Sequence, residues 1–116
     1  MFKFHKDRRR YFEIQKLNSE KSVVPFIEQK ITIKPGFRVL EIGCGEAGVL
    51  LPFLERDCIA MGIELDVQRL ELANELLKEY IEENKIRFIG KDIYKVNADE
   101  LGGKFDLIIL KDVFNA

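Results

Sequence analysis

Acidic side chains stand at the ends of three short apolar segments of this chain, and a run of glycines follows the first of them. The segment 37–42 contains Glu41 and leads into Gly43, Gly45 and Gly48, which match the pattern G-x-G-x-x-G. Glycine suits a loop that turns sharply off a strand and lets a ligand approach its backbone, because it adopts positive φ angles and has no Cβ. The segment therefore predicts a strand, a tight turn and a helix start that together bind a ligand.

The glycine pattern alone does not distinguish a nicotinamide dinucleotide from another adenosine ligand. Glu41 favours another ligand, because a carboxylate two residues before the first glycine would repel the diphosphate of a dinucleotide. S-adenosylmethionine has no phosphate and carries an ammonium group and a sulfonium. We therefore expect a positively charged amino-acid moiety to lie near Glu41.

Two further carboxylates follow later apolar segments. Glu64 comes directly after the segment 58–63, about 20 residues beyond the first glycine, where the acidic residue of such a unit binds the ribose hydroxyls. Asp66 competes for this role but better suits the N-cap of the helix that follows. Asp92 comes shortly after a third segment, 86–89.

The stretch Val39-Leu-Glu-Ile-Gly-Cys-Gly45 resembles the first motif of the class I S-adenosylmethionine-dependent methyltransferases. The order of the motifs extends the resemblance over about residues 31–114. The usual third glycine of the family would fall at Ala47. The resemblance implies that the cofactor is S-adenosylmethionine and that it is bound by Glu41, Gly43, Cys44, Gly45, Glu64, Leu65, Asp92, Ile93 and Lys111.

The resemblance also implies roles for the residues near the adenine and the methionine end. Asp92 would accept from the adenine amino group, with Leu65 and Ile93 as apolar neighbours of the purine. The alternative for Asp92 is that it caps a turn. The backbone at Lys111, just after the segment 105–110, would meet the methionine end of the cofactor.

The reaction implied is methyl transfer to an O, N or C nucleophile of an acceptor, with a small molecule favoured. The pattern Asp-Pro-Pro-Tyr of base-modifying methylases is absent after the segment 105–110, which lowers the expectation of a nucleic-acid acceptor. Asp112 is the best-placed candidate for a general base, and its alternative role is that of a turn residue. His5 is interpreted as a surface residue, and Cys44 as a small filler in a tight turn.

Composition limits the remaining possibilities. The chain has 116 residues, of which 47% are hydrophobic and 34% charged, with a net charge of −1. These values indicate one soluble domain without general attraction for nucleic acids or membranes, and we expect it in the cytoplasm. Two cysteines support neither a disulfide framework nor a zinc site.

The order of elements predicts an α/β fold. Apolar strands alternate with helical segments, which favours an open, mostly parallel sheet of four strands in the order 3-2-1-4, flanked by helices, as in a Rossmann-like methyltransferase core. We expect residues 1–30 to form an N-terminal helical arm and residues 31–116 the cofactor-binding half of the domain. Asn18 and Ser19 are predicted to cap a separate helix that continues to about Lys30.

The arginines of the arm have two interpretations. Arg8, Arg9 and Arg10 could form a basic patch for an anionic substrate, but a solvated helical arm is the interpretation we favour, since charge runs usually face water.

The sequence stops shortly after the predicted fourth strand. We therefore expect a truncated core whose fourth strand is an exposed apolar edge and self-associates. An NAD(P)-dependent oxidoreductase and a non-catalytic Rossmann-like binding module are the alternative functions, supported by the glycine pattern with Glu64 and by the short chain, respectively.

Overall fold

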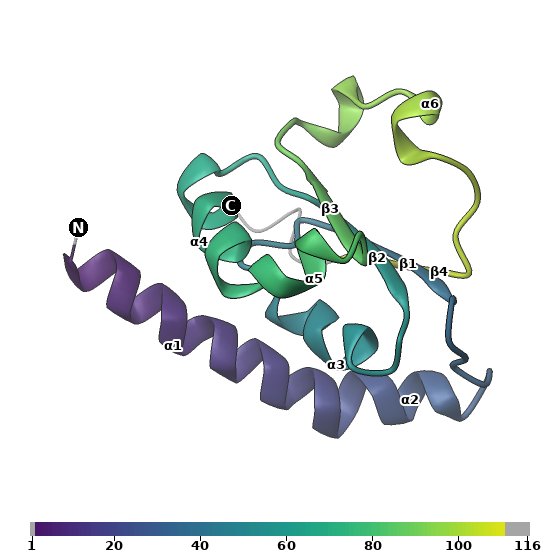
Figure 1. The fold of residues 1–116 in the computed structure, drawn as a ribbon. Coiled ribbons are helices and arrows are strands. Elements are labelled where there is room, and N and C mark those ends of the chain that lie inside the picture. The colour runs from purple at the N-terminus through teal and green to yellow at the C-terminus, as the bar shows by residue number, and fades with distance from the viewer. Residues whose placement is uncertain (1, 111–116) are drawn as a thin grey trace.

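The computed structural model describes the backbone of residues 2–110 and the side chains of residues 7–110. Its sheet consists of four parallel strands: β1 (Arg38–Ile42), β2 (Ile59–Ile63), β3 (Ile86–Ile89) and β4 (Leu107–Leu110). Their order is β3-β2-β1-β4, which confirms the predicted fold class (Figure 1). The strand order reverses at β1, so the crevice that such folds use for ligands lies beyond the C-terminal ends of β1 and β4.

Helices cover the two faces of the sheet unequally. One face carries α1 (Phe2–Asn18), α2 (Val24–Glu28), α3 (Leu51–Leu54), α4 (Val67–Leu76) and α5 (Lys78–Glu82), and the segment with α6 (Ala98–Leu101) lies over the other (Figure 1). Alternate residues of β1 point to opposite faces, so Val39 belongs to the larger core and Leu40 to the smaller one. No helix among residues 2–110 has the length and apolar character that crossing a membrane requires.

The helical arm differs from the prediction. Asn18 has helical backbone angles (φ −64°, ψ −39°) and its side chain caps nothing, so the predicted separate helix start at Asn18 and Ser19 is wrong. Instead α1 runs through a π-helical turn, Ser19–Val23, directly into α2. The Ser19 hydroxyl is buried and donates to the carbonyl oxygen of Val49 at 2.8 Å, a tertiary contact that replaces the predicted cap. Pro25 lies in the first turn of α2, where its missing N–H is tolerated.

Two local turns fix the connections around β1 and β2. Gly36 has φ +84° in a turn that the Phe37 N–H closes by donating to Lys34 O at 3.0 Å. Asp66 is the N-cap of α4 and accepts from the N–H groups of Gln68 and Arg69, as predicted. These turns fix where β1 begins and where the chain leaves β2.

β4 lies at one edge of the sheet and is apolar on both faces. Leu107 and Ile109 pack against the larger core, whereas Ile108 and Leu110 on the opposite face are 56% and 64% exposed. The predicted exposed apolar strand is therefore observed in residues 107–110. Residues 111–116, which include Lys111 and Asp112, lie outside the described residues.

Candidate functional site

The glycine loop, residues 43–48, leaves the C-terminal end of β1. Gly43, Gly45 and Ala47 have positive φ angles of 79°, 57° and 68°. Ala47 stands where the family resemblance places a third glycine, and it adopts the left-handed conformation in spite of its Cβ, at a cost of about 1–2 kcal/mol. The loop thus keeps the backbone path of a glycine-rich turn.

The N–H groups of the glycine loop donate to acceptors within the chain. Those of Gly43 and Cys44 donate to the carbonyl oxygen of Ile63 at 2.8 and 3.1 Å. The other bonds join Gly45 N–H to Glu64 Oε1 (2.7 Å), Ala47 N–H to Cys44 O (2.8 Å) and Gly48 N–H to Gln15 Oε1 (3.2 Å). Diphosphate binding by such loops relies on N–H groups that face the ligand. In this arrangement those five groups are already used.

Glu64 connects the glycine loop to the start of α4. Its Oε1 atom accepts from Gly45 N–H, and its Oε2 atom accepts from Asp66 N–H at 2.9 Å. A carboxylate offers about four lone-pair sites, so each oxygen of Glu64 can accept a further hydrogen bond from a hydroxyl donor. The side chain is only partly buried. Glu64 thus keeps accepting capacity at the C-terminal end of β2, and its ribose role stays a prediction.

Negative charge surrounds Cys44 in the glycine loop. Burial raises the pKa of the Cys44 thiol well above its ordinary value, and the charges of Glu41 and Glu64 raise it further. Glu41 is fully buried in β1. The thiol is therefore protonated at neutral pH, and the nearby Arg69 guanidinium offsets part of the effect of the two carboxylates.

The remaining predicted site residues lie at the same edge of the sheet. Ile63 of β2 pairs in register with Ile42 of β1 and Ile89 of β3, so the residues that follow these strands leave the sheet side by side. Asp92 accepts from Tyr94 N–H at 3.0 Å and caps the 3-10 turn Ile93–Lys95. Its capping role is thus observed, and its ligand role stays a prediction. Leu65 is exposed, and Ile93 packs against the smaller core.

An ion cluster that the sequence analysis did not predict joins the loop to two helices. Glu46 of the glycine loop is fully buried and pairs with Arg8 of α1 and Arg69 of α4. Arg8 Nη2 lies 2.8 Å and Arg69 Nη2 3.0 Å from Glu46 Oε1. The Tyr11 ring lies 4.2 Å from the Arg8 guanidinium and 5.7 Å from that of Arg69.

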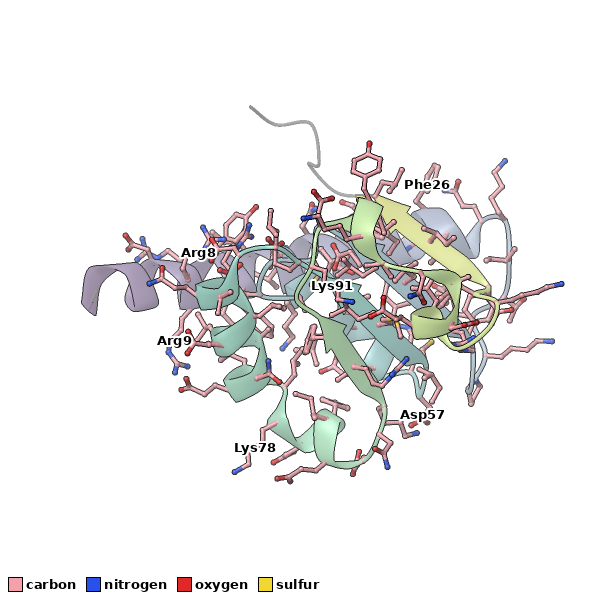
Figure 2. All side chains as sticks on the ribbon, turned by 90° about the horizontal axis from the view of Figure 1, so that it is seen from above. Arg8, Arg9, Phe26, Asp57, Lys78 and Lys91 are labelled. Carbon is pink, nitrogen blue, oxygen red and sulfur yellow. The ribbon has the colours of Figure 1, made fainter. Side chains whose placement is uncertain are left out.

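The pairing fixes the charge of Glu46. Burial alone would raise the pKa of its carboxyl, but the hydrogen bonds from Arg8 and Arg69 outweigh it and leave the pKa below its ordinary value. The solvated-arm interpretation is therefore wrong for Arg8. Arg9 and Arg10 are exposed, and Arg9 pairs with Glu75 of α4 (Figure 2). The sequence carried one signal for this cluster: Glu46 stands between the small residues Gly45 and Ala47. A carboxylate in such a tight turn is expected to need a cationic partner if it is buried.

The described residues contain no group of three or more His, Cys, Asp or Glu side chains that could hold a metal ion. What the site offers is a glycine loop, carboxylates at the ends of β1 and β2, and a sheet with the strand order β3-β2-β1-β4. These features fit the class I methyltransferase fold that the first motif predicted.

A known family matches this chain over residues 39–116 and is described as "Methyltransferase domain". The chain therefore belongs to the methyltransferase-domain family. This match confirms the resemblance of the first motif to the S-adenosylmethionine-dependent methyltransferases.

One curated relative is the ribosomal RNA small subunit methyltransferase A of Clostridium botulinum, which is 35% identical over 109 residues. The match covers 94% of this chain and 37% of the relative, so the chain spans little more than a third of that protein's length.

Solved structures of methyltransferases share the fold. Magnesium protoporphyrin IX methyltransferase from Synechocystis, with bound SAH, has a TM-score of 0.68 at 21% identity, over 92% of this chain and 52% of that one. PKMT2 from Rickettsia typhi, in complex with AdoHcy, has a TM-score of 0.58 at 28% identity, over 67% of this chain and 15% of that one. The chain therefore shares the fold of these methyltransferases.

Proposed function

We propose that this chain binds S-adenosylmethionine at the C-terminal ends of β1 and β2 and that it acts as the cofactor-binding part of a methyltransferase. The observation that carries the proposal is the pair of carboxylates, Glu41 and Glu64, at the strand ends that flank the glycine loop. Glu41 and Glu64 both act on the Cys44 thiol, while the loop N–H groups that could bind a diphosphate donate to acceptors of the chain. Both facts favour a cationic adenosine ligand over the nicotinamide dinucleotide of the alternative function.

Each part of the ligand has a proposed partner. Glu64 would accept from the ribose hydroxyls, and Glu41 would lie towards the ammonium group. The backbone of Gly43, Cys44 and Gly45 would line the ligand between them. The further partners are Asp92 for the adenine amino group, Leu65 and Ile93 for the faces of the purine, and the backbone of Lys111 for the methionine end.

Bound S-adenosylmethionine supplies an activated methyl group, whose carbon bonds to the acceptor's lone pair while its bond to sulfur breaks and leaves S-adenosylhomocysteine. The chain has then to orient the acceptor behind the methyl carbon and to exclude water. The acceptor's proton passes to a base, for which Asp112 is the candidate. Since Asp112 lies outside the described residues, this role stays a prediction.

The proposed acceptor is a small molecule. The net charge of −1 gives the chain no general attraction for a polyanion, and Arg8, one of the arginines that could form a basic patch, is paired with Glu46. The similar proteins described above include a ribosomal RNA methyltransferase and a magnesium protoporphyrin IX methyltransferase. Methyl transfer to RNA that falls steeply with added salt would instead identify a nucleic-acid acceptor.

The ligand proposal is tested by replacing Glu64. Glu64→Gln keeps the size of the side chain but removes the charge that accepts the ribose hydroxyls, so we expect the affinity for S-adenosylhomocysteine to fall about tenfold or more in calorimetry. Glu71→Gln, an exposed carboxylate on α4, is the matched control and should leave the affinity unchanged. Equal affinities of the two variants would contradict the assignment of Glu64.

We also propose that residues 1–30 act as the arm of the cofactor-binding half, 31–116, and that the chain self-associates through β4. The edge position of β4 and the exposure of Ile108 and Leu110 support self-association.

A further inference from the structure

One face of α1 and of the π-helical turn after it is directed at the glycine loop. Arg8, Tyr11, Gln15 and Ser19 recur three or four residues apart, the spacing of one helix face. Arg8 pairs with Glu46, Gln15 accepts from Gly48 N–H, and the Ser19 hydroxyl donates to Val49 O. This face therefore makes polar contacts with residues 46–49 at three points along its length.

The approach of α1 to the loop is close. A Cβ added to Gly48 would lie 2.4 Å from the carbonyl oxygen of Phe12 and 2.7 Å from Gln15 Cβ, so only glycine lets the helix backbone reach this point. Phe12 itself is buried in the larger core. The path of the loop at residues 46–48 thus depends on α1 being docked.

Glu46 links this docking to the ligand-binding part of the loop. It stands between Gly45 and Ala47, both in the left-handed conformation, and Gly45 N–H donates to Glu64 Oε1. Arg69 extends the link, because its guanidinium packs directly against Gly45. A Cβ added to Gly45 would lie only 2.0 Å from Arg69 Nη2. Moving Glu46 would therefore displace the residue that Glu64 holds.

We propose that α1 is a clamp on the glycine loop, and that Arg8 and Glu46 are positioning residues that couple docking of this helix to cofactor binding. This inference rests on the proposed function. It assigns to the N-terminal arm a part in forming the cofactor site, which neither the basic-patch nor the solvated-arm interpretation included. Because binding linkage is reciprocal, the cofactor in turn stabilises the docked helix.

Coupling needs a contact that differs between the free and the bound chain. Gln15 offers one, because its Nε2 atom is buried and has no hydrogen-bond partner among the described residues, while its Oε1 atom accepts from the loop. A buried donor without a partner costs about 1–3 kcal/mol. A ligand carboxylate or a water that it orders would satisfy this donor, and so would favour the docked helix.

The ion cluster allows docking to be weakened without leaving Glu46 unpaired. Arg8→Gln removes the pair with α1 but keeps Arg69 on Glu46. Arg9→Gln is the matched control, since it removes an exposed pair between the same helix and Glu75 of α4, which does not involve the loop. Arg8→Lys keeps the positive charge, so its affinity for S-adenosylhomocysteine should lie between those of Arg8→Gln and the unsubstituted chain.

The test measures the affinity for S-adenosylhomocysteine by calorimetry and the hydrogen exchange of the α1 amides with and without it. Arg8→Gln should weaken binding about tenfold, within the usual range of such coupling, while Arg9→Gln changes it less than twofold. In the unsubstituted chain, the ligand should slow exchange in residues 8–19.

The outcomes separate the two proposals. Unsubstituted chain that binds no S-adenosylhomocysteine overturns the proposed function and the clamp with it. If the unsubstituted chain binds, but Arg8→Gln binds equally well and the exchange of α1 ignores the ligand, the clamp alone is overturned.

Discussion

Glu46 shows how a single residue can decide the state of the loop. It is a fully buried carboxylate held between two arginines of different helices. Its two partners, Arg8 and Arg69, stand 38 and 23 positions away in the chain, so no local pattern could have paired them. Removing the carboxylate leaves two guanidinium groups near each other without a counter-charge.

Glu46→Gln should therefore destabilise the chain more than a surface substitution does. We expect a loss of about 3 kcal/mol of unfolding free energy at pH 7, the effect of breaking a buried ion pair. Urea unfolding measures it, with Glu75→Gln as the control, because Glu75 belongs to an exposed pair worth at most about 1 kcal/mol. Equal losses in the two variants would show that the cluster contributes no more than a surface pair.

The same carboxylate predicts a pH dependence. The folded-state pKa of Glu46 lies below the ordinary 4.5 because its arginine hydrogen bonds outweigh burial. Its contribution is therefore fully present above pH 4.5 and is lost as the pH falls through the lower folded-state pKa. The stability difference between the unsubstituted chain and Glu46→Gln should shrink from pH 7 towards pH 3. A difference that stays constant over this range would contradict the pairing.

Both cysteines should react slowly in the folded chain. Burial and the neighbouring carboxylates raise the pKa of Cys44, and burial raises that of Cys58 to about 11. Only the thiolate is a nucleophile, so at pH 8 a thiol reagent should label the native chain far more slowly than the urea-unfolded chain. Rapid labelling of Cys44 under native conditions would mean that the glycine loop opens readily.

The elements show which parts of the structure the sequence could predict. The strands were predictable because short apolar runs carry Glu41 and Glu64 at or near their ends, and the Asp66 signal acts through local backbone chemistry. The helix start at Asn18 was wrong because a tertiary bond of Ser19 replaced the local cap. Contacts between distant segments, such as those of α1 with the loop, have no local signal.

β2 carries an element-level prediction at Gly62. A Cβ at this position would lie 2.6 Å from Cys44 Sγ and 3.0 Å from the Phe88 ring. Gly62→Ala should thus cost about 1–3 kcal/mol by overpacking, and Cys44→Ala in the same chain should recover part of it. Urea unfolding of the two single variants and the double variant measures the coupling. If the losses of unfolding free energy in the two single variants add up to that of the double variant, the contact between Gly62 and Cys44 is not the source of the destabilisation.

At the scale of the whole molecule, the two edges of the sheet differ. β3 is followed by the segment that packs over the smaller core, whereas β4 exposes Ile108 and Leu110 beside β1. Apolar edge strands favour pairing with another chain. The molecule thus has its proposed cofactor site at the C-terminal ends of β1 and β2, and its proposed association surface at the β4 edge.

Sedimentation velocity tests this association. The unsubstituted chain should show a concentration-dependent rise in mass, and Ile108→Lys should lower it, because an edge lysine opposes strand pairing. Lys78→Glu, a charge change on α5 away from β4, is the control and should leave the mass unchanged. A chain that stays monomeric at high concentration would contradict self-association through β4.

The most direct test of the central claim compares two ligands on the same unsubstituted chain. Calorimetric titration with S-adenosylhomocysteine should show saturable binding, because the carboxylates that flank the loop, Glu41 and Glu64, suit an amino-acid ammonium group. Titration with NAD should show none, because the loop N–H groups already donate within the chain. Binding of NAD together with no binding of S-adenosylhomocysteine would contradict the account.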